Sequence, residues 1–368
     1  MTVHKKALPW FLPEVGGPER DKVLEVIESG YINDGEVARA FEARVAKVVG
    51  VKHCVAVTSG TAAIALSLMA KGIGPGDEVI VPDLTFIATA NAVRLAGAEV
   101  KLVDIDPRRF TLDVDKTEAA IGPRTRAVIP VDVNGRGADY TRLEPLCRAR
   151  GLALICDSTE GLGSKFHNRP LGSFGDTGCF SFSAAKTISS GQGGMIATDD
   201  DDLHDRLREL KDQGRRTVGT GGNDLHPVMG YNFKYTNLQA AVGLAQMDRL
   251  EGRLAHFRRR DGWYRELLAG CPGIELPPLD DGEEVRQWTD VLVRDRDRLS
   301  AALDALKLGN RPFWYPLHSQ VPYKAPDKDF PATVSVSYRG LWLPSSFDLT
   351  REDAEYVAAS IRDIMKGR

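Results

Sequence analysis

Short apolar runs rich in valine and isoleucine alternate with helical patterns between about residues 53 and 200. Seven of these runs are predicted to be strands: His53–Val57, Glu78–Val81, Glu99–Val103, Ala127–Val133, Leu152–Cys156, Thr177–Phe182 and Met195–Thr198. Strands that are apolar on both faces and separated by crossover helices are typical of a largely parallel sheet between helices. The pattern therefore predicts an α/β fold, in which ligands gather at strand ends and helix N-termini.

Apolar residues at helical spacing predict the helices before and between these strands. The predicted helices are Pro18–Ser29, Glu36–Val48, Thr61–Met69, Ala88–Leu95 and Tyr140–Arg150. A further helical segment, from Thr236 to about Ala269, is expected to bridge to a second unit.

The pattern changes at about Pro272. Two strands, Ile274–Leu276 and Gln287–Val293, and two helices, Arg298–Leu306 and Arg351–Met365, are predicted there. We therefore expect two domains: a large one over residues 1–250, which includes an N-terminal segment, and a small α/β C-terminal domain over residues 251–368.

Composition and charge argue against several classes of protein. The net charge of the 368 residues is −3, whereas a nucleic-acid binder needs a concentrated basic face. No apolar run approaches the roughly 20 residues that a membrane span requires, and residues 1–9 lack the apolar core of a secretory signal. We expect a cytoplasmic protein with no nucleic-acid or membrane partner.

The five cysteines are scattered and form no CxxC pair, and the seven histidines show no HExxH spacing. The cysteines are therefore interpreted as small buried hydrophobic residues in a reducing compartment. No metal site is expected.

Lys186 is the first candidate for chemistry. It follows the aromatic, β-rich run Gly178–Ala185 and precedes the turn Gly191–Gly194. In such a setting an ammonium loses hydration, which favours the free amine as a nucleophile toward a carbonyl. The alternative is a solvated surface lysine, as most of the chain's lysines and arginines are.

Pyridoxal phosphate needs an amine for a Schiff base, an anion beside the pyridine nitrogen, a phosphate cup and a stacking surface. Lys186, Asp157 at a strand end, the Thr58–Ala63 helix start with Ser181, and Phe86 are candidates for these four parts. Each has a plainer alternative: a capping carboxylate for Asp157, a simple capping sequence at Thr58–Ala63 and a core aromatic for Phe86.

Taken together, the motifs resemble those of the DegT/StrS family of sugar aminotransferases, in the family's order and from about residue 8 to 365. The matching strings are Thr58–Ala63, Val79–Pro82, Asp157–Glu160, Phe180–Lys186, Gly191–Gly194, Gly230–Ala241 and Arg311–His318.

This resemblance implies a fold-type-I pyridoxal phosphate transferase that acts as a homodimer with shared active sites. The implied roles are the Schiff-base lysine for Lys186, the pyridine partner for Asp157, a contact near the phenolic oxygen for Glu160, phosphate binding for Gly60, Thr61 and Ser181, and stacking for Phe86. Asn232 would reach the phosphate of the neighbouring subunit, although the local sequence alone favours a turn residue.

Two departures from the family pattern stand out. Glu160 stands where many relatives have glutamine, which affects the hydrogen bonding of the phenolic oxygen. The usual Pro-Val-His-Leu-Tyr-Gly is here Pro130-Val131-Asp132-Val133-Asn134-Gly135, and the role of Asp132 is open at this point. Retention of Lys186 favours amino transfer, because the sugar dehydratases among the relatives replace this lysine with histidine.

The resemblance also implies the substrates: an amino-acid donor, L-glutamate, and a keto-sugar acceptor. Candidate substrate contacts are Tyr31, Ser183, Arg311, Trp314 and His318. The string Phe313–His318 resembles the perosamine-synthase branch, whose acceptor is GDP-4-keto-6-deoxymannose.

Several alternatives stay open. The alternative for His318 is a structural histidine with satisfied hydrogen bonds, and the alternative for Trp314 is a core aromatic. The alternative acceptors are a keto-cyclitol and an 8-keto-octulosonate. A further alternative is a non-catalytic sensor that binds pyridoxal phosphate or an amino sugar. The nucleotide is not specified, since there is no Walker motif and no strand precedes Gly219–Gly222.

Overall fold

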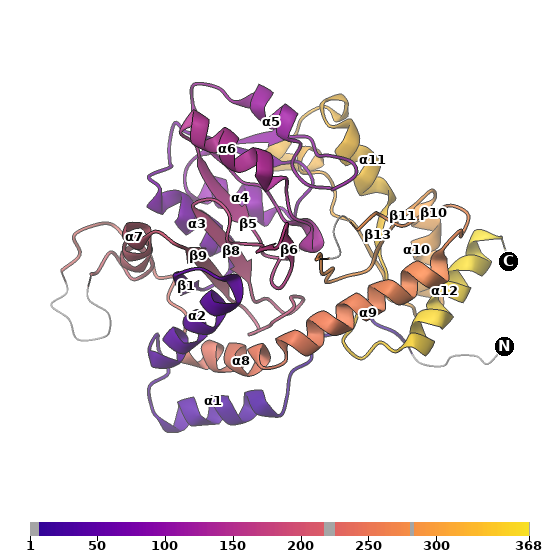
Figure 1. The fold of residues 1–368 in the computed structure, drawn as a ribbon, viewed down its shortest axis with the longest axis horizontal. Helices are drawn as coiled ribbons and strands as arrows, with labels where there is room; N and C mark the ends of the chain where they lie inside the picture. Colours follow the sequence, from indigo (N-terminus) through magenta and orange to yellow (C-terminus); the bar gives the residue numbers. More distant parts are fainter. Residues whose placement is uncertain (1–6, 217–224, 280–282, 368) are drawn as a thin grey trace.

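The computed structural model describes residues 7–216, 225–279 and 283–367 (Figure 1). The Gly219–Gly222 stretch lies outside these ranges, as do residues 1–6 of the segment assessed above for a secretory signal.

A seven-stranded sheet in the order β1-β9-β8-β5-β4-β2-β3 forms the centre of the larger part of the molecule (Figure 1). Its strands are β1 (His53–Val57), β2 (Glu78–Pro82), β3 (Glu99–Val103), β4 (Thr125–Val128), β5 (Ala153–Asp157), β8 (Thr177–Ser181) and β9 (Gly194–Thr198). β9 is antiparallel to both of its neighbours, whereas the other paired strands of this sheet are parallel. The predicted α/β class with a mainly parallel sheet is confirmed.

The predicted end of the fourth strand was wrong. The strand was expected to reach Val133 but ends at Val128. Pro130 has no N–H to continue a ladder, and Val131 makes a single bridge to Asp157 before the chain turns into the 3-10 helix η1 (Val133–Gly135). The chain therefore leaves the sheet beside the end of β5.

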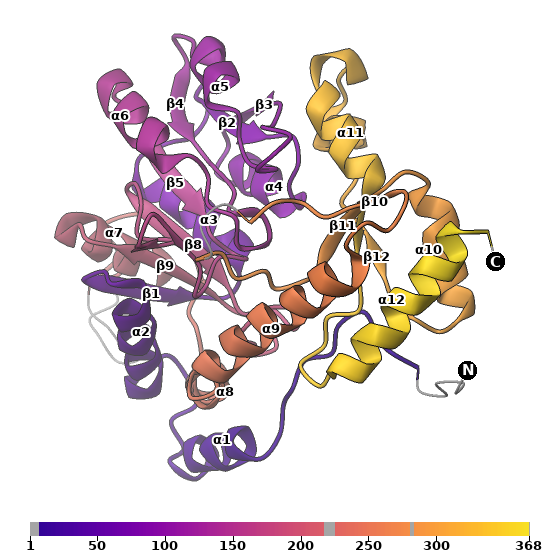
Figure 2. The same ribbon diagram turned by 45° about the vertical axis from the view of Figure 1, so that its right-hand side comes forward.

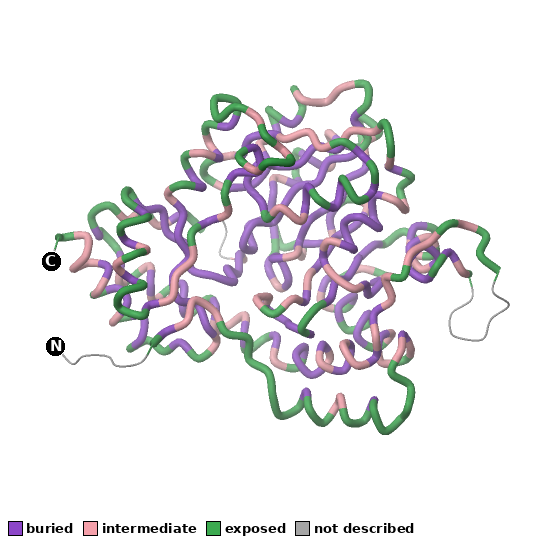
Figure 3. The backbone as a smooth tube through the Cα atoms, turned by 180° about the vertical axis from the view of Figure 1, so that it is seen from behind, coloured by how far each residue is buried: buried purple, intermediate pink, exposed green. Residues whose placement is uncertain are grey.

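Helices cover both faces of this sheet (Figures 1 and 2). Those that the sequence predicted are α1 (Pro18–Glu28), α2 (Glu36–Val49), α3 (Gly60–Ala70), α4 (Ala88–Leu95) and α6 (Tyr140–Arg150). Two further helices, α5 (Val114–Ala120) and α7 (Asp201–Lys211), and the hairpin of β6 (Lys165–Phe166) and β7 (Arg169–Pro170) were not predicted. Burial is concentrated in the sheet and the elements around it, whereas α1 is largely exposed (Figure 3).

The helical segment after Thr236 forms two helices rather than one. A capping box of Thr236 and Gln239 begins α8 (Asn237–Met247), and α9 (Leu250–Leu268) follows after a short break. α9 runs toward the C-terminal elements and packs against α12 (Arg351–Met365) (Figure 2). The proposed domain boundary after residue 250 lies in the first turn of α9 and stays a prediction.

The C-terminal part contains a four-stranded antiparallel sheet in the order β10-β11-β13-β12. Its elements are β10 (Ile274–Glu275), β11 (Asp290–Val293), α10 (Arg296–Ala305), β12 (Arg311–Pro312), the 3-10 helices η2 (Leu317–Ser319), η3 (Val321–Tyr323) and η4 (Asp327–Asp329), α11 (Pro331–Arg339) and β13 (Gly340–Trp342). Leu8 bridges to Leu308, so the start of the described chain docks on this part.

All five cysteines are free and buried, as the sequence analysis expected. Within the described ranges, no helix is long and apolar enough to cross a membrane. Those ranges also contain no group of three or more histidine, cysteine, aspartate or glutamate residues that could hold a metal ion.

Candidate active site

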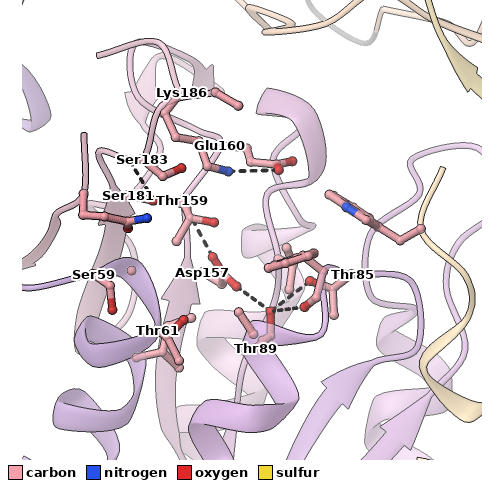
Figure 4. A pocket seen from close by; sticks show the side chains of 18 of the residues that line it. Ser59, Thr61, Thr85, Thr89, Asp157, Thr159, Glu160, Ser181, Ser183 and Lys186 are labelled. Atoms are coloured by element: carbon pink, nitrogen blue, oxygen red, sulfur yellow. Dashed lines mark hydrogen bonds and ion pairs between the residues drawn. The ribbon is translucent and has the colours of Figure 1, made fainter. Parts of the chain in front are cut away.

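A cavity of about 340 Å³ lies at the C-terminal ends of the parallel strands (Figure 4). Ligand sites of open α/β sheets are found at this edge. Its polar lining consists of Ser59, Thr61, Thr85, Thr89, Asp157, Thr159, Glu160, Ser181, Ser183, Lys186, Gln192 and Arg311. Its apolar lining includes Phe86, Trp288 and Trp314.

Most of the predicted site residues line this cavity. They are Gly60, Thr61, Phe86, Asp157, Glu160, Ser181, Ser183, Lys186, Arg311 and Trp314. Tyr31, Asn232 and His318 are not part of its lining.

The N-terminus of α3 forms one end of the cavity. Ser59 caps the helix, since its Oγ accepts a hydrogen bond from the backbone N–H of Ala62 (3.1 Å). The first N–H groups of a helix have no intrahelical partner, so those of Gly60 and Thr61 are available to an anion. A Cβ at Gly60 would lie only 3.0 Å from Thr159 Cγ2 and 3.1 Å from Ser181 Cβ, which explains the glycine.

Asp157, the last residue of β5, lies buried at the base of the cavity. Its Oδ2 accepts a hydrogen bond from Thr89 Oγ1 (2.7 Å) and its Oδ1 accepts one from the backbone N–H of Thr159 (3.2 Å) (Figure 4). Burial raises the pKa of this carboxyl, while these hydrogen bonds and Lys186 oppose the rise. A cation bound against Asp157 would favour its ionised form.

Lys186 projects into the cavity from the turn that follows β8. Its Nζ donates a hydrogen bond to Glu160 Oε1 (3.1 Å), and both side chains are largely buried (Figure 4). The backbone N–H of Asn134 holds the second oxygen of Glu160 (2.8 Å). Glu160 thus presents an oriented carboxylate to the amine. A glutamine at this position would carry no charge.

Asp132 lies behind the cavity and supports its base. Its carboxylate accepts hydrogen bonds from Ser158 Oγ (2.5 Å), Tyr140 Oη (2.7 Å) and the backbone N–H of Ala138 (3.2 Å). Complete burial raises its pKa to about 7, against the pull of these donors. Asp132, which stands where the family pattern has histidine, therefore forms the centre of a buried polar cluster next to Asp157.

Several lining residues were not predicted, among them Thr89, Thr159, Gln192 and Trp288. Thr89 lies one turn after Phe86, so the start of α4 already carried a signal for it. Trp288 carried none, because it comes from a segment more than 100 residues after Lys186 in the sequence.

The remaining wall of the cavity comes from the C-terminal part and consists of Trp288, Arg311 and Trp314. Trp314 packs edge-on against Trp342 (5.0 Å between ring centroids), and the Arg311 guanidinium lies 5.7 Å from the centroid of Trp342. A second cavity of about 370 Å³ adjoins this wall and shares Thr85, Phe86, Arg311 and Trp314 with the first. This second cavity, lined largely by apolar side chains, thus lies next to the first.

His318 is buried away from the cavity lining. Its Nδ1 lies 2.6 Å from Asp83 Oδ2, its backbone N–H donates to Asp83 Oδ1 (2.8 Å), and its ring stacks on Phe330 (4.6 Å). Burial raises the pKa of Asp83, and its hydrogen bonds with His318 oppose the rise. These contacts fasten the C-terminal part to the end of β2, and the predicted substrate contact of His318 stays untested.

Tyr31 and Asn232 lie on the surface. Asn237 Nδ2 donates a hydrogen bond to the backbone carbonyl of Tyr31 (3.0 Å), and the backbone of Asn232 bridges to Asp212. Neither residue lines the cavity, and their predicted roles stay predictions.

The DegT/DnrJ/EryC1/StrS aminotransferase family model matches residues 13–362, which is nearly the whole chain. The chain belongs to this family. It is a sugar aminotransferase that depends on pyridoxal phosphate.

Individual proteins agree with this assignment. The chain is 39% identical over 363 residues to a GDP-perosamine synthase of Caulobacter vibrioides, covering 96% of this chain and 97% of that protein. It is 32% identical to DesI, solved in the presence of its TDP-sugar product, with a TM-score of 0.90 over 100% of this chain and 95% of that one. It is 25% identical to the PLP-form of Spr1654 from Streptococcus pneumoniae, with a TM-score of 0.91 over 98% and 99% of the two chains.

The residues of the cavity fit this cofactor. The free N–H groups of α3 and the hydroxyls of Thr61 and Ser181 suit a phosphate, and Asp157 is a buried carboxylate. Phe86 is half exposed and lines the cavity, as a stacking residue must be. When bound, pyridoxal phosphate supplies an aldehyde and an electron-withdrawing ring.

Proposed function

We propose that this enzyme transfers an amino group from L-glutamate to a nucleotide-linked 4-keto-6-deoxy sugar, with GDP-4-keto-6-deoxymannose as the acceptor. The observation that carries the proposal is the pairing of an intact polar base, with Lys186, Glu160 and Asp157, to an aromatic wall with Arg311. Support for the nucleotide comes from the GDP-perosamine synthase of Caulobacter vibrioides. The product would serve amino-sugar and polysaccharide biosynthesis.

The proposed work of each residue follows from its chemistry. Asp157 would hold the proton of the pyridine nitrogen by charge pairing, and Gly60, Thr61 and Ser181 would fix the phosphate. Lys186 Nζ would move a proton to and from the substrate carbon that carries the amino group. Glu160 would pair with the Lys186 ammonium while the amine holds that proton.

The wall residues would select and orient the acceptor. Arg311 is the charged side chain of the lining that belongs to the C-terminal part, and its guanidinium suits a sugar hydroxyl or a diphosphate. Trp314 and Phe86 offer apolar surfaces to the sugar ring and its methyl group. Ser183 would donate a hydrogen bond at the polar side.

A panel assay tests the acceptor. Purified enzyme would be given L-glutamate with GDP-4-keto-6-deoxymannose, the corresponding TDP- and UDP-linked sugars, a keto-cyclitol or 8-keto-octulosonate. The amino product would be followed by mass and the 2-oxoglutarate by a coupled assay. We expect the highest kcat/KM with the GDP-linked sugar; a higher value with a cyclitol or an octulosonate would contradict the proposal.

The cofactor's absorption separates an enzyme from a sensor. Glutamate should bleach the visible band of the purified protein, and the Lys186→Ala variant provides the control. A band that glutamate leaves unchanged would favour a protein that only binds the cofactor.

We further propose that the enzyme is a cytoplasmic homodimer with shared active sites. Support comes from Tyr31 and Asn232, which lie outside the cavity of their own subunit, and from apolar side chains exposed on and around α1. These side chains are Leu12, Val15, Leu24, Ile27 and Ile32.

Mixed dimers test this arrangement. Lys186→Ala and Asn232→Ala subunits would be inactive or weak separately, and mixing them would restore one intact site in each heterodimer. Restored activity, with a dimer mass in sedimentation, would support shared sites. No restoration in a verified heterodimer would contradict them.

A further inference from the structure

Asn134 lies directly behind the Lys186–Glu160 pair. It occupies the middle of η1 with φ 52° and ψ 37°, and it is completely buried. Glycine adopts this left-handed conformation readily, whereas among other residues asparagine and aspartate tolerate it best. The position therefore restricts which side chains it can hold.

The backbone of Asn134 orients the carboxylate at the amine. Its N–H donates to Glu160 Oε2 (2.8 Å), while Glu160 Oε1 accepts from Lys186 Nζ (3.1 Å). One oxygen is thus fixed by the main chain and the other faces the lysine. The charged groups that line the cavity around this pair are Asp157, Glu160, Lys186 and Arg311.

The side chain of Asn134 binds Trp288, which belongs to the aromatic wall. Its Nδ2 donates to the carbonyl of Trp288 (2.8 Å), and its Oδ1 accepts from the N–H of the same residue (3.0 Å). This reciprocal pair joins residues that are 154 positions apart. The Trp288 ring lines the cavity, with its centroid 5.6 Å from Lys186 Nζ.

Neighbouring contacts hold the same segment. Ser164 Oγ accepts a hydrogen bond from the N–H of Val285 (2.9 Å), and Arg136 forms a buried ion pair with Asp290. A Cβ at Gly135 would lie 2.4 Å from the carbonyl oxygen of Val285, so the two segments are closely packed. Among these residues, Asn134 also contacts Glu160, the partner of Lys186.

We propose that Asn134 is a positioning residue with two separable contacts. Its backbone N–H holds Glu160 at Lys186, and its side chain holds the Trp288 wall at the same amine. One residue thereby aligns the proton partner of Lys186 with Trp288, which lines the cavity beside the proposed acceptor residues Arg311 and Trp314. The inference rests on the proposed function for the identity of that acceptor.

Asn134→Gly removes one contact alone. Glycine adopts the left-handed conformation and keeps the N–H for Glu160, but it cannot bind Trp288. We expect KM for the acceptor to rise about tenfold, with kcat within about threefold, because two hydrogen bonds to the wall are lost. Tryptophan fluorescence should change, whereas the pH titration of the bound cofactor's absorption should not.

Glu160→Gln changes the other contact. Glutamine still accepts the N–H of Asn134 but removes the negative charge beside Lys186 Nζ, the atom that would join the cofactor. The absorption titration should move to lower pH, and KM for the acceptor should stay within about twofold. Asn168→Gly is the matched control, because Asn168 has φ 64° on the exposed β6–β7 turn; it should move neither readout.

Unchanged KM and fluorescence in Asn134→Gly would overturn the proposal. If thermal stability alone falls, the proposal is also overturned, because Asn134 then has only a structural role. A Glu160→Gln titration identical to wild type would overturn it as well. If the proposed acceptor is incorrect, wild type itself will not aminate that sugar. Fluorescence and absorption then still decide the role of Asn134, because neither needs an acceptor.

Discussion

The base and the wall of the cavity are built by different forces. At the base, polar groups hold one another: Asp157 is fixed by Thr89 at 2.7 Å, and Lys186 by Glu160 at 3.1 Å. The wall consists of rings packed on rings, with centroids 5.0 to 5.2 Å apart between Trp342 and Trp314, Trp342 and Trp288, and Trp288 and Trp10.

This difference separates chemistry from selection. Directional hydrogen bonds specify charges and atom positions, which a fixed reaction requires. Aromatic packing depends on shape and tolerates related ligands. Changes at the base should therefore lower kcat, whereas changes at the wall should alter KM and the choice of acceptor.

Loss of the amine should have the largest effect. Lys186→Ala is expected to lower kcat by about 10⁴-fold or more, because both the nucleophile and the proton carrier are removed. Single-turnover kinetics with glutamate would measure it. Lys165→Ala, at an exposed ion pair with Glu283, is the control and should stay within about twofold of wild type. Wild-type rates in Lys186→Ala would refute the role of Lys186 as nucleophile and proton carrier.

Neutralising the buried carboxylate should come next. Asp157→Asn keeps the shape but removes the anion, and we expect kcat to fall by about 10²- to 10⁴-fold. Asp176→Asn is a matched control at the opposite end of the same strands, where Asp176 accepts the N–H of Leu154 (2.8 Å). That variant should lose stability rather than activity, as separate kinetic and thermal measurements would reveal.

Removal of the charge on the wall should have a smaller and different effect. Arg311→Ala is expected to raise KM for the acceptor about tenfold and to leave the half-reaction with glutamate unchanged. Steady-state kinetics with both substrates would test this. Arg339→Ala, at a surface ion pair with Glu275, controls for general loss of positive charge. An equal loss in both half-reactions would remove the distinction between base and wall.

The polar cluster behind the base should affect stability through pH. The pKa of Asp132 is raised from 3.8 to about 7, so the folded state binds its proton more tightly than the unfolded chain does. Its contribution to stability is therefore complete below about pH 4 and is lost as pH rises through 7. Asp132→Asn should flatten this decline in Tm between pH 4 and 8. A variant curve parallel to wild type would contradict the assignment.

Most residues at the base of the cavity could be predicted from the local sequence. The seven strands that carry it were predicted because each is a compact apolar run, and Asp157, Ser181 and Lys186 lie at or just after strand ends. Ser59 and Gly60 begin a helix through ordinary capping chemistry. Such features depend on neighbours in the sequence.

The wall depended on distant contacts and was only partly predictable. Arg311 and Trp314 were identified through family resemblance, whereas Trp288 and its partner Asn134 are joined across 154 positions. α11 was missed because its Thr-Val-Ser-Val-Ser core favours strands, although Pro331 at its first turn allows a helix start. α7 was missed despite leucines at 203, 207 and 210, which have helical spacing.

The burial of all five cysteines has a consequence for handling the protein. Burial raises the pKa of the thiols of Cys54, Cys147, Cys156 and Cys179, so little reactive thiolate exists near neutral pH. Peroxide and maleimide reagents should consequently spare the native enzyme and label it only as it unfolds. Cys179 pairs in register with Asp157 across β5 and β8, so its labelling rate would report when the base of the cavity itself opens.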